Sequence, residues 1–156
     1  MSDQYDLSAT SLYLKSYKLA EHLPHCADIT RIYCSRFQGI LVVDGKYVKV
    51  KGYDTKIPIL YGIDYATHDI PTFVLSPSES YLAWKKYFLS LRLLNYPLKI
   101  VVADDNENIR KALYDVYPKA FFQLCTNHYK ENIRSSLMVR TDPTYQPFMN
   151  EICNLF

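Results

Sequence analysis

From residue 38 onward, the hydrophobic period of this 156-residue chain changes once, near residue 76, and this change limits the folds open to it. Before it, three short stretches have the apolar runs or the two-residue alternation that are typical of strands. After it, apolar residues recur every three or four positions, as on a helix face, and two short apolar runs interrupt them. The sequence therefore predicts three strands followed by helix, strand, helix, strand and helix.

Prolines and short polar turns separate the predicted elements. The turn at 67–69 is short enough to join the second and third strands as an antiparallel hairpin. Residues 76–79 have the arrangement of a capping box and open a helix that ends near Pro97. The predicted strands are 38–50, 58–66, 70–75, 98–103 and 120–125, and the other predicted helices are 11–23, 106–117 and 126–139, with a further short helix in the tail.

The predicted order of elements is that of the ribonuclease-H-like fold. In this α/β fold, three antiparallel strands are followed by two strands that join the sheet through helical crossovers, giving a mixed five-stranded sheet flanked by helices. Other α/β arrangements fit the same order. The length suits one compact domain.

Composition narrows the class of protein less than the order of elements does. The hydrophobic share is 49% and the net charge is +2, so the charge neither implies nor excludes a nucleic-acid partner. Neither a membrane-spanning run nor a secretory signal is visible, so we expect no membrane association. The four cysteines are irregularly spaced, which favours reduced thiols and a cytoplasmic location.

Two aspartates lie within or directly after predicted apolar strands, where an acidic side chain is unexpected. Asp44 lies within the first predicted strand, and Asp104 directly follows the fourth. These strands are neighbours in a ribonuclease-H-like sheet, so the two carboxylates would converge and hold Mg²⁺ or Mn²⁺. The alternative is structural: Asp44 and Gly45 would form a turn, and Asp104 would cap the next helix with Glu107 at its third position.

A Cys-x-x-His segment follows the fifth predicted strand. It contains Cys125 and His128, and Asn132 lies one helical turn after His128 on the same face. A zinc site would need a second pair of ligands, and the candidates form no recognisable motif. Those candidates are His22, His25, Cys26 and Cys153.

At these residues the sequence resembles the DDE transposases of the Mutator-like superfamily and their bacterial insertion-sequence relatives. The matching segments are LVVDGKYVKV, IVVADDNENIRKAL and VYPKAFFQLCTNHYKENI, and the resemblance covers roughly residues 38–139. The resemblance implies a metal-dependent enzyme that cleaves DNA and transfers strands at transposon ends with two Mg²⁺ or Mn²⁺ ions. It makes Asp44 and Asp104 two of three metal-binding acids, and it places Cys125, His128 and Asn132 beside the site.

The resemblance also leaves the site open in two respects. Asp105 stands where relatives often have glycine, and it is an alternative ligand to Asp104. The family's third acid is a glutamate beyond a largely helical insertion, and Glu151 is the only late candidate. We therefore expect an incomplete catalytic core of residues 38–139, an N-terminal helical segment of residues 1–37, and the start of a truncated insertion or a tail at residues 140–156. Whether the chain is active stays open.

DNA is the partner that the resemblance implies, and a homodimer is left open. The N-terminal segment is short for the separate DNA-binding module that relatives carry. A solvated charged face is the other explanation for the basic residues. Other functions considered are a different ribonuclease-H-like nuclease and a non-enzymatic remnant that binds nucleic acid or a partner. The basic residues that could contact phosphates are Lys46, Lys49, Lys51, Lys56, Lys130 and Arg134.

Overall fold

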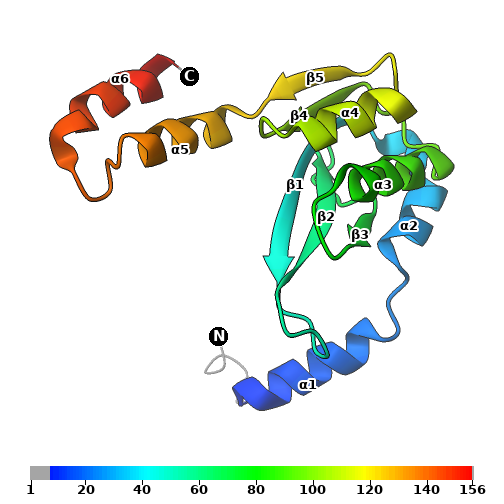
Figure 1. The fold of residues 1–156 in the computed structure, drawn as a ribbon. Coiled ribbons are helices and arrows are strands. Elements are labelled where there is room, and N and C mark those ends of the chain that lie inside the picture. The colour runs from blue at the N-terminus through cyan, green and yellow to red at the C-terminus, as the bar shows by residue number, and fades with distance from the viewer. Residues whose placement is uncertain (1–7, 156) are drawn as a thin grey trace.

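A mixed five-stranded sheet in the order β3-β2-β1-β4-β5 forms the centre of the protein (Figure 1). The structure is a computed structural model that describes residues 8–155. The first seven residues of the predicted segment 1–37, and residue 156 of the predicted tail, lie outside them. The strands are β1 Ile40–Val48, β2 Ile57–Asp64, β3 Phe73–Leu75, β4 Ile100–Ala103 and β5 Phe121–Leu124, and the α-helices are α1 Ala9–Ala20, α2 Cys26–Tyr33, α3 Tyr81–Leu93, α4 Glu107–Val116, α5 Thr126–Ser136 and α6 Gln146–Leu155.

The direction of each strand confirms the predicted fold. β1, β2 and β3 pair in antiparallel fashion, whereas β4 pairs in parallel with β1 on one side and with β5 on the other. The chain reaches β4 through α3 and reaches β5 through α4. This is the ribonuclease-H-like arrangement.

Helices α3 and α4 lie side by side on one face of the sheet (Figure 1). Because side chains alternate along a strand, Leu41 and Val43 of β1 point to this face, and both are buried. The predicted apolar stripe of α4 is confirmed, and Trp84 of α3 is fully buried. The core residues of the two helices are Ala83, Trp84, Tyr87, Phe88, Leu91, Ile109, Ala112, Leu113 and Val116.

Gly39 sets the start of β1 against β4. Its φ is +88°, a conformation that favours glycine, and a Cβ at this position would overlap the carbonyl oxygen of Pro97. The Gly39 carbonyl accepts hydrogen bonds from the amides of Lys99, at 2.8 Å, and Ile100, at 3.0 Å. This close approach of two backbones begins the parallel pairing of β1 with β4.

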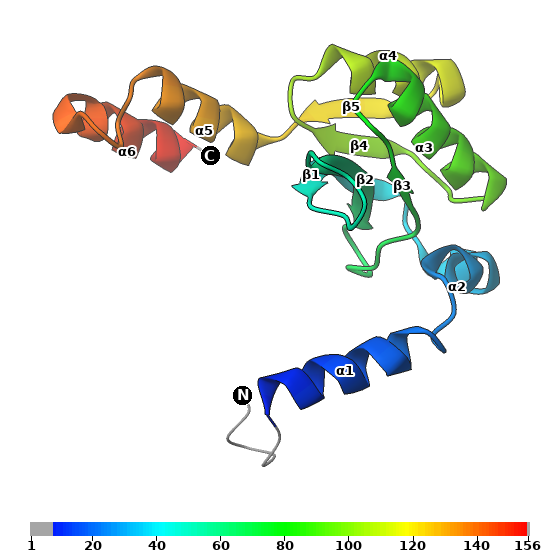
Figure 2. The ribbon, with the colours of Figure 1, turned by 60° about the horizontal axis from the view of Figure 1, so that its bottom comes forward.

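The two ends of the described chain extend away from the sheet (Figures 1 and 2). α1 confirms the predicted N-terminal helix, but it has no buried residue. At the other end, α5 leaves the end of β5 and packs against α6, where Met149 is fully buried. The tail helix is longer than the short one that we predicted.

Two local predictions from the sequence are wrong. Residues 76–79 do not form a capping box, because α3 begins at Tyr81 and its N-cap is Ser80, whose hydroxyl accepts from the Ala83 amide at 3.3 Å. β3 is only three residues long, so the connection from β2 is wider than a tight hairpin. Helix α2 was not predicted.

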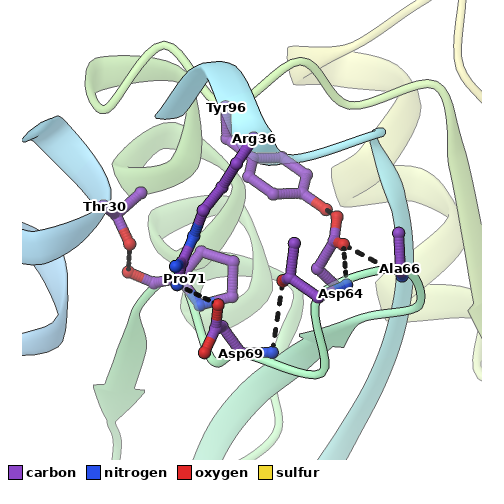
Figure 3. Close-up of polar contacts among 8 residues, drawn as sticks. Thr30, Arg36, Asp64, Ala66, Asp69, Pro71 and Tyr96 are labelled. Atoms are coloured by element: carbon purple, nitrogen blue, oxygen red, sulfur yellow. Dashed lines mark hydrogen bonds and ion pairs between the residues drawn. The ribbon is translucent and has the colours of Figure 1, made fainter. Parts of the chain in front are cut away.

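A buried acid, Asp64, organises the connection between β2 and β3 (Figure 3). The Tyr96 hydroxyl donates to its Oδ2 at 2.6 Å, and the amides of Ala66 and Thr67 donate to its Oδ1 at 3.1 and 3.0 Å. Burial alone would raise the pKa of Asp64, but these hydrogen bonds outweigh burial and lower it below its ordinary value. Asp64 therefore has a structural role.

Helix α2 is attached to the same connection. Thr30, which is buried, donates from its hydroxyl to the Pro71 carbonyl at 2.7 Å, and Arg36 pairs with Asp69 (Figure 3). The ring of His25, which caps α2, lies 5.2 Å from the ring of Phe73. These contacts hold α2 at the β3 edge of the sheet.

Within residues 8–155, no helix has the length and apolar character needed to cross a membrane.

Candidate functional site

Asp104 directly follows β4, the parallel neighbour of the strand β1 that contains Asp44. The register pairs Val42 of β1 with Val102 of β4, and each aspartate comes two residues after its valine. Two residues is one full period of a strand, so continuation of this register would place both side chains on the face of the sheet opposite α3 and α4. The charge of Asp44 contributes to the raised pKa of Asp104, which indicates that the two carboxylates lie within electrostatic range of each other.

Both structural alternatives for these aspartates are wrong. Asp44 and Gly45 do not form a turn, because they lie inside β1 and pair with Tyr61 and Leu60 of β2. Asp104 does not cap α4. The cap is Asn106, whose side chain accepts from the amide of Asn108 at 2.9 Å. Neither aspartate is therefore needed to end a strand or to start a helix.

Asp104 lies near other negatively charged side chains. Partial burial raises its pKa, and the nearby charges of Asp44 and Asp105 raise it further, whereas His128 acts in the opposite direction. The charge of Asp44 is thus felt at Asp104. Like charges brought together in this way favour a bound cation or a bound proton.

Asp105, the alternative ligand, is engaged elsewhere. Its carboxylate forms a 2.7 Å ion pair with Arg110 of α4, and its side chain is 69% exposed. Asp104 is half-buried by comparison. The neighbour that directly follows the apolar strand is therefore the better placed of the two.

The Cys-x-x-His segment lines a small pocket at the start of α5. The pocket has a volume of about 200 Å³, and its lining includes Cys125, His128 and Asn132, as the helical spacing predicts. Asp105 also lines this pocket, so the pocket adjoins the residue that follows Asp104. The Nδ1 atom of His128 is buried and has no hydrogen-bond partner within residues 8–155. A nitrogen in this state is available to a group that enters the pocket.

Glu79 is an acid of this region that the sequence analysis assigned to a helix cap. It lies between β3 and α3, and its carboxylate rests on Gly45, where a Cβ would come within 2.6 Å of Oε2. Burial raises the pKa of Glu79, and Asp104 and Asp44 raise it further, while the Tyr47 side chain lowers it. Only the folded chain reveals this position, because no spacing rule links residue 79 to residues 44 and 104.

The donor set of the site fits a hard divalent cation. Asp44 and Asp104 offer carboxylate oxygens, and Glu79 adds more in the same electrostatic neighbourhood. Oxygen ligands of this kind suit Mg²⁺ and Mn²⁺. Across residues 8–155, no three His, Cys, Asp or Glu side chains are gathered closely enough to hold a metal ion as they stand. The same finding leaves the zinc alternative without a second pair of ligands in this range.

Glu151, the late candidate for a third acid, lies on α6. It is exposed, and α6 packs on α5 rather than on the sheet. Both views place α6 beyond α5, on the side away from β1 (Figures 1 and 2). In this arrangement Glu151 does not join the two aspartates.

The basic residues fall into two groups. Those on β1 and the loop that follows it are exposed, and so they are free to meet a phosphate backbone: Lys46, Lys49, Lys51 and Lys56. In the second group, on α5, Lys130 is half-buried and Arg134 pairs with Glu131, which also holds Arg140 at 2.9 Å. The loop between β1 and β2 is thus the more accessible basic surface.

Comparison with known proteins gives a family match by sequence and similar folds among solved structures. The sequence model of the family described as "Transposase, Mutator family" matches residues 30–152. Among solved structures, the chain is similar to the integrase catalytic core domain of HTLV-2, which was solved in complex with magnesium. The identity is 14%, the TM-score is 0.46, and the alignment covers 74% of this chain and 82% of that one. No curated protein sequence matches the chain.

Proposed function

Because this chain belongs to the Mutator family of transposases, we propose that it carries a DDE-type site for metal-dependent DNA strand cleavage and strand transfer. Asp44 and Asp104 are the residues that hold the divalent cations. The observation that carries the proposal is that each aspartate comes two residues after one of the paired valines Val42 and Val102, where the continued register would place both on the face that α3 and α4 leave open. Family membership alone would not select these two acids among the 16 acidic residues of the chain.

The chemistry of the site follows from these side chains. When bound, Mg²⁺ or Mn²⁺ activates a water or a 3′-hydroxyl and stabilises the leaving oxygen at a phosphodiester. The carboxylates of Asp44 and Asp104 must be ionised to bind it, and the positive charge of His128 favours the ionised form of Asp104. The exposed lysines near β1 provide phosphate contacts that position the DNA.

Cys125, His128 and Asn132 are proposed to support the site from the neighbouring strand. Cys125 follows β5, and its amide donates to the Ala103 carbonyl at 2.6 Å, one residue before Asp104. The pocket that these side chains line therefore borders the acids. Their side chains hold neighbouring groups in place at the edge of the site, or they contact DNA there.

The test compares Mn²⁺ binding and Mn²⁺-dependent nicking of supercoiled DNA by the wild type, Asp44→Asn and Asp104→Asn. These changes keep the shape of the side chain and remove its charge. Asp54→Asn is the control, because Asp54 is an exposed aspartate in the loop after β1. We expect both activities to be lost in the first two variants and kept in the control.

Two outcomes would reject the proposal in different ways. Unchanged Mn²⁺ binding in both site variants would remove the acids from the metal site. DNA binding without nicking, equal in the wild type and in both variants, would favour the non-enzymatic alternative instead.

A further inference from the structure

The outer edge of β5 is open to a further strand. The sheet order ends at β5, and no strand within residues 8–155 pairs with its outer side (Figure 1). The amide of Phe121 points inward and donates to the carbonyl of Lys99 at 2.8 Å. Because backbone groups alternate along a strand, the amides of Phe122 and Leu124 point outward. An uncovered edge of this kind is a template for pairing with another chain.

The side chains of this edge strand are uncharged and mostly apolar. β5 has the sequence FFQL, without the charged residues or the proline that usually protect an exposed edge. Phe121 is 73% exposed and Leu124 is 38% exposed. Exposed apolar side chains on an unpaired strand indicate a surface that another segment covers.

A pocket opens at the start of β5. It has a volume of about 690 Å³, within the range of roughly 300–1,000 Å³ that is typical of ligand sites. Its lining is mainly apolar: Leu98, Val116 and Ala120 are buried, and Phe121 lines the pocket as well as the edge. A segment that lies along β5 can therefore place an apolar side chain in this pocket.

Three cations belong to the same lining. Arg92, Lys99 and Lys119 line the pocket, and all three are exposed. The Nη1 atom of Arg92 donates to the Val116 carbonyl at 3.3 Å, which holds the guanidinium at the end of α4. None of the ion pairs within residues 8–155 involves these cations, and no acidic residue of that range lines the pocket. The charge of the pocket is therefore complementary to an acidic ligand.

From these features we propose that the β5 edge and the pocket bind an extended acidic segment of a partner protein. The segment pairs with β5 as an added strand, and one of its apolar side chains fills the pocket. Its carboxylates meet the three cations of the lining. The exposed edge, the apolar pocket and the unpaired cations then have one occupant in common.

Two other occupants fit this surface less well. The phosphate backbone of a nucleic acid would use the cations, but it would leave the apolar lining and Phe121 uncovered. A second copy of the chain that paired through its own β5 would bring no acid in that strand to meet the cations, since β5 contains none.

The pocket lies at the opposite end of β4 and β5 from the candidate metal site. The two strands are parallel, and the pocket is at their starts, whereas Asp104 and Cys125 follow their ends. A segment bound at the pocket therefore leaves the acids accessible, and its binding does not require a metal ion.

The test measures the fluorescence anisotropy of short fluorescein-labelled peptides in which aspartate alternates with isoleucine, leucine or phenylalanine, titrated with the 156-residue chain. We expect saturable binding of at least one of them. Lys99→Glu combined with Lys119→Glu should weaken this binding about tenfold or more, because like charges then face the peptide. Lys15→Glu, the same charge reversal at an exposed position of α1, should leave it within about twofold of the wild type.

Changes in the peptide test the charge and the strand pairing without altering the protein. Asparagine in place of aspartate should also weaken binding about tenfold or more. In an added strand, every second amide of the peptide faces β5. N-methylation of that set of amides should abolish binding, whereas methylation of the alternate set should leave it within about threefold of the unmodified peptide.

The proposal fails if none of the peptides binds, if the double charge reversal has no larger effect than Lys15→Glu, or if both methylated peptides bind equally. Duplex DNA that displaces the peptide, and that loses affinity in the same double variant, would assign the surface to nucleic acid instead. Self-association of the chain that the peptide reverses, measured by sedimentation, would assign it to a second copy. None of these measurements needs Mn²⁺, so the proposed metal site stands or fails separately.

Discussion

Arg110 holds Asp105 in a 2.7 Å ion pair, and this contact gives the adjacent acids Asp104 and Asp105 different surroundings. Asp105 pairs with Arg110 of α4, whereas Asp104 comes two residues after Val102, the partner of Val42. The order of the two residues in the sequence does not reveal this division. Because Asp105 already pairs with Arg110, Asp104 is the better candidate for the metal ligand.

Asp105→Asn should therefore retain metal binding. We expect its Mn²⁺ affinity to fall by no more than about threefold, the effect of one exposed charge that is lost near a site. Calorimetry on Asp105→Asn and Asp104→Asn in parallel checks this. A larger loss in Asp105→Asn than in Asp104→Asn would exchange their roles.

Proton competition should make metal binding depend on pH. Burial and the charge of Asp44 raise the pKa of Asp104, so protons compete with the cation at pH values where an ordinary aspartate is already ionised. We expect Mn²⁺ affinity to fall as pH is lowered from about 7 to about 5, with protons released on binding. Titrations in buffers of different ionisation enthalpy count those protons.

His128→Ala tests in which direction a neighbouring residue shifts the pH dependence of Mn²⁺ affinity. The charge of His128 opposes the upward shift of the Asp104 pKa, so its removal should move the affinity curve to higher pH. His22→Ala is the control, because His22 lies in the exposed segment after α1. A curve that moves to lower pH would contradict the interaction between His128 and Asp104.

Removal of the Tyr96 hydroxyl should destabilise the fold. Tyr96→Phe leaves the buried Asp64 carboxylate without its 2.6 Å hydrogen bond, which should cost about 1–3 kcal/mol in the free energy of unfolding. Tyr87→Phe is the matched control: that hydroxyl is buried and has no hydrogen-bond partner among residues 8–155, so its loss should cost little or nothing. Urea denaturation measures both, and equal effects would show that the hydrogen bond is not the cause.

The same hydrogen bond predicts how stability varies with pH. The pKa of Asp64 is lowered in the folded state, so its contribution is present above the ordinary value of 3.8 and is lost as pH falls through the folded value. The difference between wild type and Tyr96→Phe should therefore shrink as pH falls below about 4. Denaturation curves at a series of pH values test this, and a difference that grows in acid would contradict it.

Two glycines with left-handed backbones should respond differently to alanine. Gly39→Ala should be severely destabilising, by about 3 kcal/mol or more, because the new Cβ overlaps the Pro97 carbonyl. Gly52 has φ +91° and open space around it, so Gly52→Ala should cost only about 1 kcal/mol of backbone strain. Thermal or urea unfolding of the pair separates the steric cost from the conformational cost.

The order of elements could be predicted from the sequence because hydrophobic period and prolines mark each strand and helix. Leu41 and Val43, and the stripe on α4, are buried as that period predicts. That Asp44 and Asp104 share one metal site stays a prediction, which rests on the parallel pairing of β1 with β4. These features depend on local pattern and on a known rule of sheet topology.

Other features depend on contacts that no local pattern records. The serines at 76, 78 and 80 are all of a residue type that can cap a helix, and in the fold Ser80 is the cap. Glu79 was placed in that cap, whereas the fold places it on Gly45. Helix α2 was missed because only Thr30 of it is buried, so it has no long apolar stripe.

The parallel pairing of β1 with β4 has a consequence for the folding of the chain. If the two strands slid past each other by a single residue, the side chain of residue 104 would turn toward the layer of α3 and α4, and position 44 would lie opposite residue 103 or 105. The hydrogen bonds of the Gly39 carbonyl oppose this slip. The alignment of the two strands during folding therefore decides which side chains share a face of the sheet.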